Sequence, residues 1–236
     1  MTGAGSVVCK TTVDRILKTA KVVKVINANG GPRIMLKLLH IQSSPNLENS
    51  ITRTLSREFV ETWLAGHPGT EVDLLDLAEH PLPHWGPDAI AGFLAADSAR
   101  NAAQQAAVDL SEGLLAQVEA ADILVIGCPM YNMSMPTQLK GWIDYVSRPG
   151  RSFRFVDRTH AEGLITGKTA YVILSRGGDY SQPPASSADF QEPMLRAALA
   201  LIGITDVTFI RAEGQRMQEA AYYTQAARDQ IAALAE

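Results

Sequence analysis

Three apolar segments of this chain each end in residues that could bind a flat ligand carrying a phosphate group. Residues 35–41 lead into serine and threonine hydroxyls, residues 122–127 into a Pro-Met-Tyr-Asn stretch, and residues 168–175 into a Gly-Gly pair. Hydroxyls and the N–H groups at a helix start suit a phosphate, whereas methionine and tyrosine side chains suit a planar ring. The candidate binding residues are Ser44, Ser50, Ile51 and Thr52, then Met130, Tyr131, Asn132 and Met133, and finally Ser175, Arg176, Gly177 and Gly178.

The first of these loops, residues 42–52, runs into a predicted helix that starts near Ser50. The loop contains no lysine or arginine, so a bound phosphate monoester would be held mainly by neutral donors. This favours a flavin phosphate over a nucleotide triphosphate. The alternative is that Ser50 only caps the helix and the rest of the loop is a solvated turn.

The other two loops have residue types that shape a backbone around a ligand. Pro129 fixes the exit from its segment, and Asn132 tolerates unusual backbone angles and could turn amides toward a ligand. Gly177 and Gly178 let a backbone approach a planar group closely. Each loop has an alternative interpretation: the Met and Tyr side chains fill the core, and Asn132 or the glycines only close turns.

The surrounding pattern predicts the elements that position these loops. Strands are expected at 35–41, 71–77, 122–127, 168–175 and 206–211, with helices near 51–65, 89–93, 99–120, 137–147, 189–202 and 218–234. Strands separated by helices give a parallel sheet covered on both faces, so one three-layer α/β/α domain is expected over residues 35–236. In a five-stranded sheet of order 2-1-3-4-5 the three loops meet at one switch point, where ligands bind. Flavin mononucleotide (FMN) fits best.

Composition excludes several classes of protein. Apolar residues make up 46% of the 236 residues, and the net charge of −4 gives no footprint for nucleic acid or an anionic membrane. The two cysteines, Cys9 and Cys128, predict no disulfide and indicate a reducing compartment, so a cytoplasmic location is expected. Residues 1–34 are rich in lysine and arginine and are interpreted as a dispensable extension, mis-started or disordered, with a short amphipathic helix around residues 13–17 as a further option.

Several stretches resemble the FMN-dependent NADH azoreductases, also described as quinone reductases, of the flavodoxin-like superfamily. The resemblance covers Met35 to the C-terminus. It rests on Pro129-Met130-Tyr131-Asn132, Gln138-Leu139-Lys140, Gly163-Leu164-Ile165-Thr166-Gly167-Lys168, Ser175-Arg176-Gly177-Gly178 and Gly203-Ile204-Thr205-Asp206. It implies a flavodoxin-like fold, FMN as cofactor, NADH or NADPH as electron donor, and a homodimer that acts on quinones or azo compounds.

The resemblance also implies roles for the candidate residues. Ser44 and residues 50–52 would hold the FMN phosphate, residues 130–133 would line the ring and ribityl chain, and residues 175–178 would border the pyrimidine edge. Substrate-pocket walls are expected at Trp85, Phe153 and Phe155, with Phe93 as a further pocket or interface aromatic. The chemistry would be ping-pong hydride transfer without an obligatory catalytic side chain, and two cycles would cleave an azo bond to two amines. Met133 and Phe155 depart from residues found in some members, which affects substrate preference.

Other motifs in the chain lack features that their usual functions require. Residues 163–169 are similar to a phosphate-binding P-loop, but Glu162 stands where its first glycine is required and a strand follows instead of a helix. His80 and His84 lie among prolines, so no metal site is predicted. Two further functions remain open at this stage: a flavodoxin-like electron carrier, and a flavin-binding regulatory module that uses the basic N-terminus as its contact.

Overall fold

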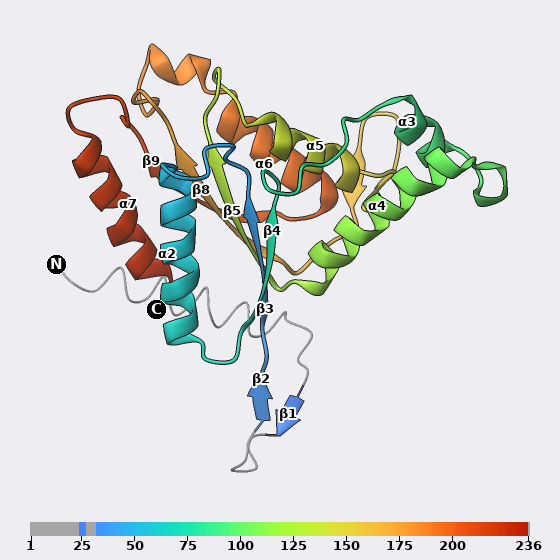
Figure 1. Cartoon of the computed structure of the whole chain (residues 1–236), viewed down its shortest axis with the longest axis horizontal. Coiled ribbons are helices and arrows are strands. Elements are labelled where there is room, and N and C mark those ends of the chain that lie inside the picture. Colours follow the sequence, from blue (N-terminus) through green and yellow to red (C-terminus); the bar gives the residue numbers. More distant parts are fainter. Residues whose placement is uncertain (1–23, 27–31, 236) are drawn as a thin grey trace.

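A five-stranded parallel sheet forms the centre of the molecule, seen here in a computed structural model that describes residues 24–26 and 32–235 (Figure 1). The strands are β3 (Lys37–Gln42), β4 (Glu71–Asp76), β5 (Ile123–Pro129), β8 (Thr169–Ser175) and β9 (Asp206–Ala212), arranged in the order β4-β3-β5-β8-β9. Taken in chain order this is 2-1-3-4-5, as predicted. All residues of β5 are buried, because helices cover both faces of a parallel sheet.

Helices form a layer on each side of the sheet (Figure 1). On one side α2 (Ile51–Gly66) and α7 (Ala220–Ala235) lie together, and their Phe59, Trp63 and Ile231 share a core with Val125 of β5. On the other side are α3 (Pro87–Leu94), α4 (Ala102–Ala120), α5 (Thr137–Val146) and α6 (Gln191–Ile202). Short 3-10 turns occur at η1 (Asp97–Ala99) and η2 (Ala185–Ala188). No described helix is long and apolar enough to cross a membrane.

Two short hairpins differ from the prediction. Strands β6 (Phe153–Phe155) and β7 (Ala161–Gly163) pair antiparallel inside the segment expected to be a long loop. Strands β1 (Lys24–Ile26) and β2 (Pro32–Ile34) pair antiparallel inside the basic extension. Strands of three residues are too short to show a periodic pattern, which is why the sequence did not reveal them. Cys9 and the optional helix around residues 13–17 lie outside the described residues.

Element ends shift by one to three residues from those expected. Strand β3 starts at Lys37 instead of residue 35, while β5 continues through Pro129 and β9 through Ala212. The predicted start of α2 is confirmed: the Ser50 hydroxyl accepts a hydrogen bond from the Arg53 N–H. Helix α6 ends as expected at Gly203, whose φ of 104° is readily reached only by glycine.

Candidate active site

The three predicted loops meet at the carboxyl edge of the sheet. Strands β3, β5 and β8 are direct neighbours, with Gln42 paired to Gly127 and Pro129 paired to Ser175. The Ser43 hydroxyl donates to the Gly127 carbonyl at 2.6 Å, and the Met130 N–H donates to the Ser175 carbonyl at 2.8 Å. These bonds join the first loop to β5 and the second loop to the third, so residues from three distant segments share one surface.

The first loop presents the N-terminus of α2. Ser44 and Thr52 are buried, and the Ser50 hydroxyl lies 3.1 Å from that of Thr52. Ser50 caps the helix, but the N–H groups of Ile51 and Thr52 donate no hydrogen bond within the described part of the chain. Free N–H groups at the start of a 16-residue helix carry a partial positive charge. The capping role and a phosphate-binding role are therefore compatible at this helix end.

Arg53 holds this loop in place, a role that was not predicted from the sequence. Its guanidinium donates to the Ser44 carbonyl from Nε at 3.0 Å and from Nη2 at 2.8 Å, and it forms a bidentate pair with Asp76 at the end of β4. Burial opposes ionisation of Asp76, but the Arg53 hydrogen bond and the Glu79 and Ala78 N–H groups hold its pKa below the usual range. The available signal was an arginine in the first helical turn together with an aspartate at a strand end.

The second loop is a tight turn with positive φ at its tip. Tyr131 and Ser134 exchange two backbone hydrogen bonds of 2.9 and 3.1 Å, and the residues between them, Asn132 and Met133, have φ of 48° and 67°. Both central residues of a type I′ hairpin turn require positive φ, which Asn tolerates and Met rarely adopts. The side chains of Tyr131 and Met133 are exposed, so they are apolar surface at the sheet edge, not core filling as the alternative interpretation held.

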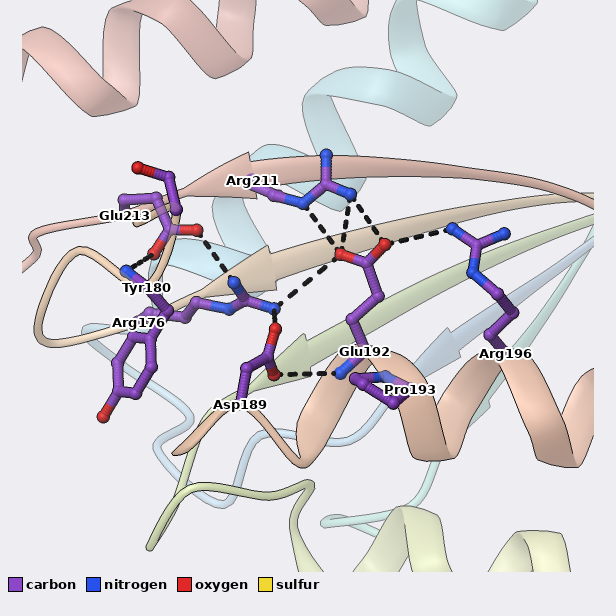
Figure 2. A pocket seen from close by; sticks show the side chains of 9 residues that line it. Arg176, Tyr180, Asp189, Glu192, Pro193, Arg196, Arg211 and Glu213 are labelled. Atoms are coloured by element: carbon purple, nitrogen blue, oxygen red, sulfur yellow. Dashed lines mark hydrogen bonds and ion pairs between the residues drawn. The ribbon is translucent and has the colours of Figure 1, made fainter. Parts of the chain in front are cut away.

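The third loop has bonded carbonyls but unpaired glycine N–H groups. The Gly177 carbonyl accepts from Arg216 N–H and the Gly178 carbonyl from Gly214 N–H, both at 3.0 Å. In the described part of the chain the N–H groups of Gly177 and Gly178 donate no hydrogen bond, and neither does that of Asn132. The Arg176 side chain is buried and points into a group of carboxylates, so only its backbone belongs to the exposed edge (Figure 2).

A buried polar cluster, His40, Gln42 and Ser56, lies beneath the first two loops. The Gln42 amide nitrogen lies 3.0 Å from the His40 ring nitrogen and donates to the Ser56 hydroxyl at 3.0 Å. A Cβ added to Gly127 would come within 3.2 Å of both Gln42 Oε1 and Ser56 Oγ, so β5 packs tightly against this cluster. Burial, helped by the nearby Arg57 and Arg53 charges and opposed by Asp76, lowers the pKa of His40 to about 4.

The depressed pKa of His40 predicts acid sensitivity of the fold. The folded protein keeps this histidine neutral while the unfolded chain takes up a proton near pH 6.5, so its stabilising contribution is present above pH 6.5 and is lost as the pH falls toward 4. Between pH 7.5 and pH 5 the free energy of unfolding should drop by about 2 kcal/mol from this group. Urea unfolding across this range measures it. In His40→Asn the free energy of unfolding should change less between pH 7.5 and pH 5. An equally large change in that variant would show that His40 is not the group responsible.

The predicted pocket aromatics form two groups. Phe153 and Phe155 contact each other on the β6–β7 hairpin with ring centroids 5.5 Å apart, and Phe153 is buried whereas Phe155 is exposed.

The second group is centred on Trp85, which packs edge-on against Phe93 and Tyr145. Trp85 also borders a cavity of about 420 Å³, whose lining includes His84, Thr137 and Lys140. The Phe93 ring also lies beneath the Arg148 guanidinium, so Phe93 has a packing role within this chain.

The assembled edge matches a ligand with an anionic end and a flat ring. Free N–H groups and hydroxyls lie at the start of α2, apolar Tyr131 and Met133 side chains lie beside β5, and further free N–H groups end the β8 loop. An FMN molecule has these same parts: a phosphate, a ring with apolar faces, and a pyrimidine edge of hydrogen-bonding groups. Among the described residues, no group of three or more His, Cys, Asp or Glu side chains is arranged to hold a metal ion.

Known proteins are similar to this chain over most of its length. Residues 36–235 match a family model described as Flavodoxin-like fold. The chain is 43% identical over 180 residues to FMN-dependent NADH:quinone oxidoreductase 2 of Pseudomonas fluorescens strain Pf-5, covering 76% of this chain and 88% of the relative. It is 44% identical over 204 residues to the FMN-dependent NADH:quinone oxidoreductase of Polaromonas naphthalenivorans, covering 86% and 94%.

A solved structure supports the same relationship. The azoreductase from Bacillus anthracis strain Sterne superposes with a TM-score of 0.79 at 27% identity, covering 85% of this chain and 99% of that one. The resemblance noted from the sequence motifs is therefore confirmed. Sheet order, loop chemistry and similarity over most of its length agree: the chain belongs to the flavodoxin-like family of FMN-dependent NADH:quinone oxidoreductases.

Proposed function

We propose that this chain binds FMN at the carboxyl edge of β3, β5 and β8 and uses NADH or NADPH to reduce quinones and azo compounds. The observation that carries the proposal is the convergence of unpaired N–H groups from three loops on one surface that also exposes Tyr131 and Met133. The relatives named above are FMN-dependent NADH:quinone oxidoreductases, and the similar structure is an azoreductase.

Each loop has a separate task in this proposal. The N-terminus of α2 holds the phosphate through backbone N–H groups and hydroxyls, since a helix start attracts an anion. Residues 130–133 contact the ring and ribityl chain, and the backbone of residues 175–178 donates hydrogen bonds to the pyrimidine edge. The FMN-contacting residues are Ser44, Ser50, Ile51, Thr52, Met130, Tyr131, Asn132, Met133, Ser175, Gly177 and Gly178, with Arg176 belonging to the site through its backbone.

The cofactor supplies the two-electron chemistry, and the protein supplies binding, orientation and fixed dipoles. The N–H groups of Asn132, Gly177 and Gly178 are donors held in place before reaction, so they favour negative charge that develops at the ring edge. Donor and acceptor substrates use the same exposed surface in turn, which makes the cycle ping-pong. An azo compound takes up four electrons on its way to two amines and therefore requires two cycles.

The proposed enzyme is a cytoplasmic homodimer whose reductase domain spans residues 35–236, with residues 1–34 as an extension outside it. Phe155 and Val156 on the β6–β7 hairpin are exposed apolar side chains that a second copy would cover. Phe153, Phe155 and Trp85 remain the candidate walls of the substrate pocket. The family match over residues 36–235 supports this domain boundary.

The visible absorption spectrum of the purified full-length protein tests the function. We expect a flavin spectrum that bleaches on anaerobic addition of NADH and returns when a quinone is added. A flavin spectrum that NADH does not change would indicate an electron carrier instead. A protein that takes up no FMN on reconstitution would contradict the proposal.

A further inference from the structure

The Arg176 guanidinium connects the ends of several elements at the candidate active site. It donates from Nη1 to Glu213 at 2.9 Å, from Nη2 to Asp189 at 2.8 Å and from Nε to Gln191 at 3.1 Å (Figure 2). Its side chain is 2% exposed, so these interactions take place away from water. A planar guanidinium can hold acceptors in three fixed directions, which a lysine ammonium does not do.

The partners of Arg176 are themselves bonded to β5, to the loop after β8 and to the start of α6. The Gln191 amide nitrogen donates to the Cys128 carbonyl at the end of β5, at 3.0 Å. The second Glu213 oxygen accepts from the Tyr180 N–H at 3.1 Å, and the second Asp189 oxygen accepts from the Gln191 N–H at 3.0 Å. One buried cation thereby links the ends of β5, β8 and β9 with the start of α6.

The backbone around Arg176 is held by the same neighbouring loop. Its N–H donates to the Ala212 carbonyl at 3.0 Å, and its carbonyl accepts from the Gln215 N–H at 2.8 Å. Together with the Gly177 and Gly178 carbonyl bonds described above, this fixes residues 176–178 along residues 212–216. The glycine carbonyls face the neighbouring loop, and the two glycine N–H groups remain available for a ligand.

We propose that Arg176 is a positioning residue for the cofactor: its side chain does not touch the flavin but holds the Gly177 and Gly178 N–H groups in the orientation that binds it. This inference rests on the proposed function. Without the guanidinium, Glu213, Asp189 and Gln191 lose a shared partner, and the carboxylates repel one another. The 176–178 loop then loses its side-chain connection to β5 and α6, whereas its backbone bonds to residues 212–216 and the bond from the Met130 N–H to the Ser175 carbonyl remain.

Three variants of the full-length protein separate this role from a general effect on folding. Arg176→Met removes the charge, and Arg176→Lys keeps the charge without the planar fork. The control, Arg211→Met, removes an arginine that binds Glu192 and lines the same cavity of about 530 Å³ (Figure 2). Arg211 shares only Glu192 with Arg176, whose Nη2 lies 3.9 Å from that carboxylate, and within the described residues it makes no hydrogen bond to Asp189, Gln191 or Glu213.

Two readouts are used, and only one of them depends on FMN. Hydrogen–deuterium exchange of residues 176–180 and 213–217 in the apo protein should accelerate about tenfold in both Arg176 variants, and the FMN dissociation constant from flavin fluorescence quenching should rise about tenfold. Arg211→Met should stay within about twofold of wild type in both. Because Arg176→Lys keeps the buried charge, it provides the test if Arg176→Met does not fold.

Wild-type exchange and wild-type FMN affinity in Arg176→Lys would overturn the positioning role. Faster exchange with unchanged FMN affinity would also overturn it, because the conformation of the loop would then have no effect on FMN binding. A wild-type protein that binds no FMN would instead refute the proposed function, and the exchange rates would still show whether Arg176 sets the conformation of this loop.

Discussion

Replacing Gly163 by alanine is expected to lower the free energy of unfolding by about 3 kcal/mol. A Cβ at this position would overlap the backbone N and Cα of Gly203 and lie only 2.5 Å from the carbonyl carbon of Ile202. These are backbone atoms, so no rotamer change relieves the contact. The β6–β7 hairpin would have to move away from the end of α6, and the Ile165 N–H would lose its bond to the Ile202 carbonyl, now 2.9 Å long.

Urea denaturation of the wild type and the variant measures this difference, and Gly113→Ala is the matched control. Gly113 lies in α4 and an added Cβ would have nothing within 4 Å, so alanine there should stabilise the protein by about 0.5–1 kcal/mol through backbone entropy. A Gly163→Ala variant as stable as wild type would show that the hairpin is not docked against α6 as described.

Replacing Arg53 by methionine is expected to cost about 3–5 kcal/mol, because the change leaves the buried Asp76 carboxylate without its counter-charge. The Ser44 carbonyl loses both of its guanidinium donors as well, so the first loop should no longer be held against α2. We therefore expect weaker FMN binding in addition to lower stability. Chemical denaturation and flavin titration measure the two effects.

The control for Arg53 is an arginine in an ion pair at the protein surface. Arg228 and Glu58 join α7 to α2 through hydrogen bonds of 2.9 and 3.0 Å, but both side chains are partly exposed. Exposed ion pairs contribute about 0–1 kcal/mol, so Arg228→Met should have a small effect. Adding Asp76→Asn to Arg53→Met should recover part of the lost stability, since the uncompensated charge is removed. No recovery would mean that the cost arises from packing instead of charge.

The pKa of Asp76 adds a condition on pH. Because the folded protein depresses this pKa, the contribution of the pair is fully present above the usual aspartate value of 3.8 and is lost as the pH falls through the lowered folded value. This range lies below that of His40, whose effect is spread between pH 6.5 and about 4. As the pH falls, stability should therefore be lost first through protonation of His40 and then through protonation of Asp76.

Local sequence was sufficient for the features that depend on neighbouring residues. Apolar runs predicted the sheet strands, most directly β5 and β8, because a strand buried on both faces carries its signal in its own residues. The edge strand β4 is mostly exposed and has a weaker signal of this kind. Ser50 likewise predicted the start of α2, since capping involves residues three positions apart. The unusual backbone angle expected at Asn132 is a positive φ, whereas the positive φ of Met133 was not predicted, because its side chain does not favour that conformation.

The tertiary structure alone decided where the buried charged side chains point and how the β6–β7 hairpin packs against α6. Arg53 and Arg176 are ordinary residues in the sequence, and each gains its role from carboxylates at least 13 positions away. Gly163 and Gly203 were visible as parts of family motifs, but their mutual contact becomes evident only when β7 lies against the end of α6. Side-chain direction and close backbone approach depend on long-range packing, so a local pattern of residue types does not contain them.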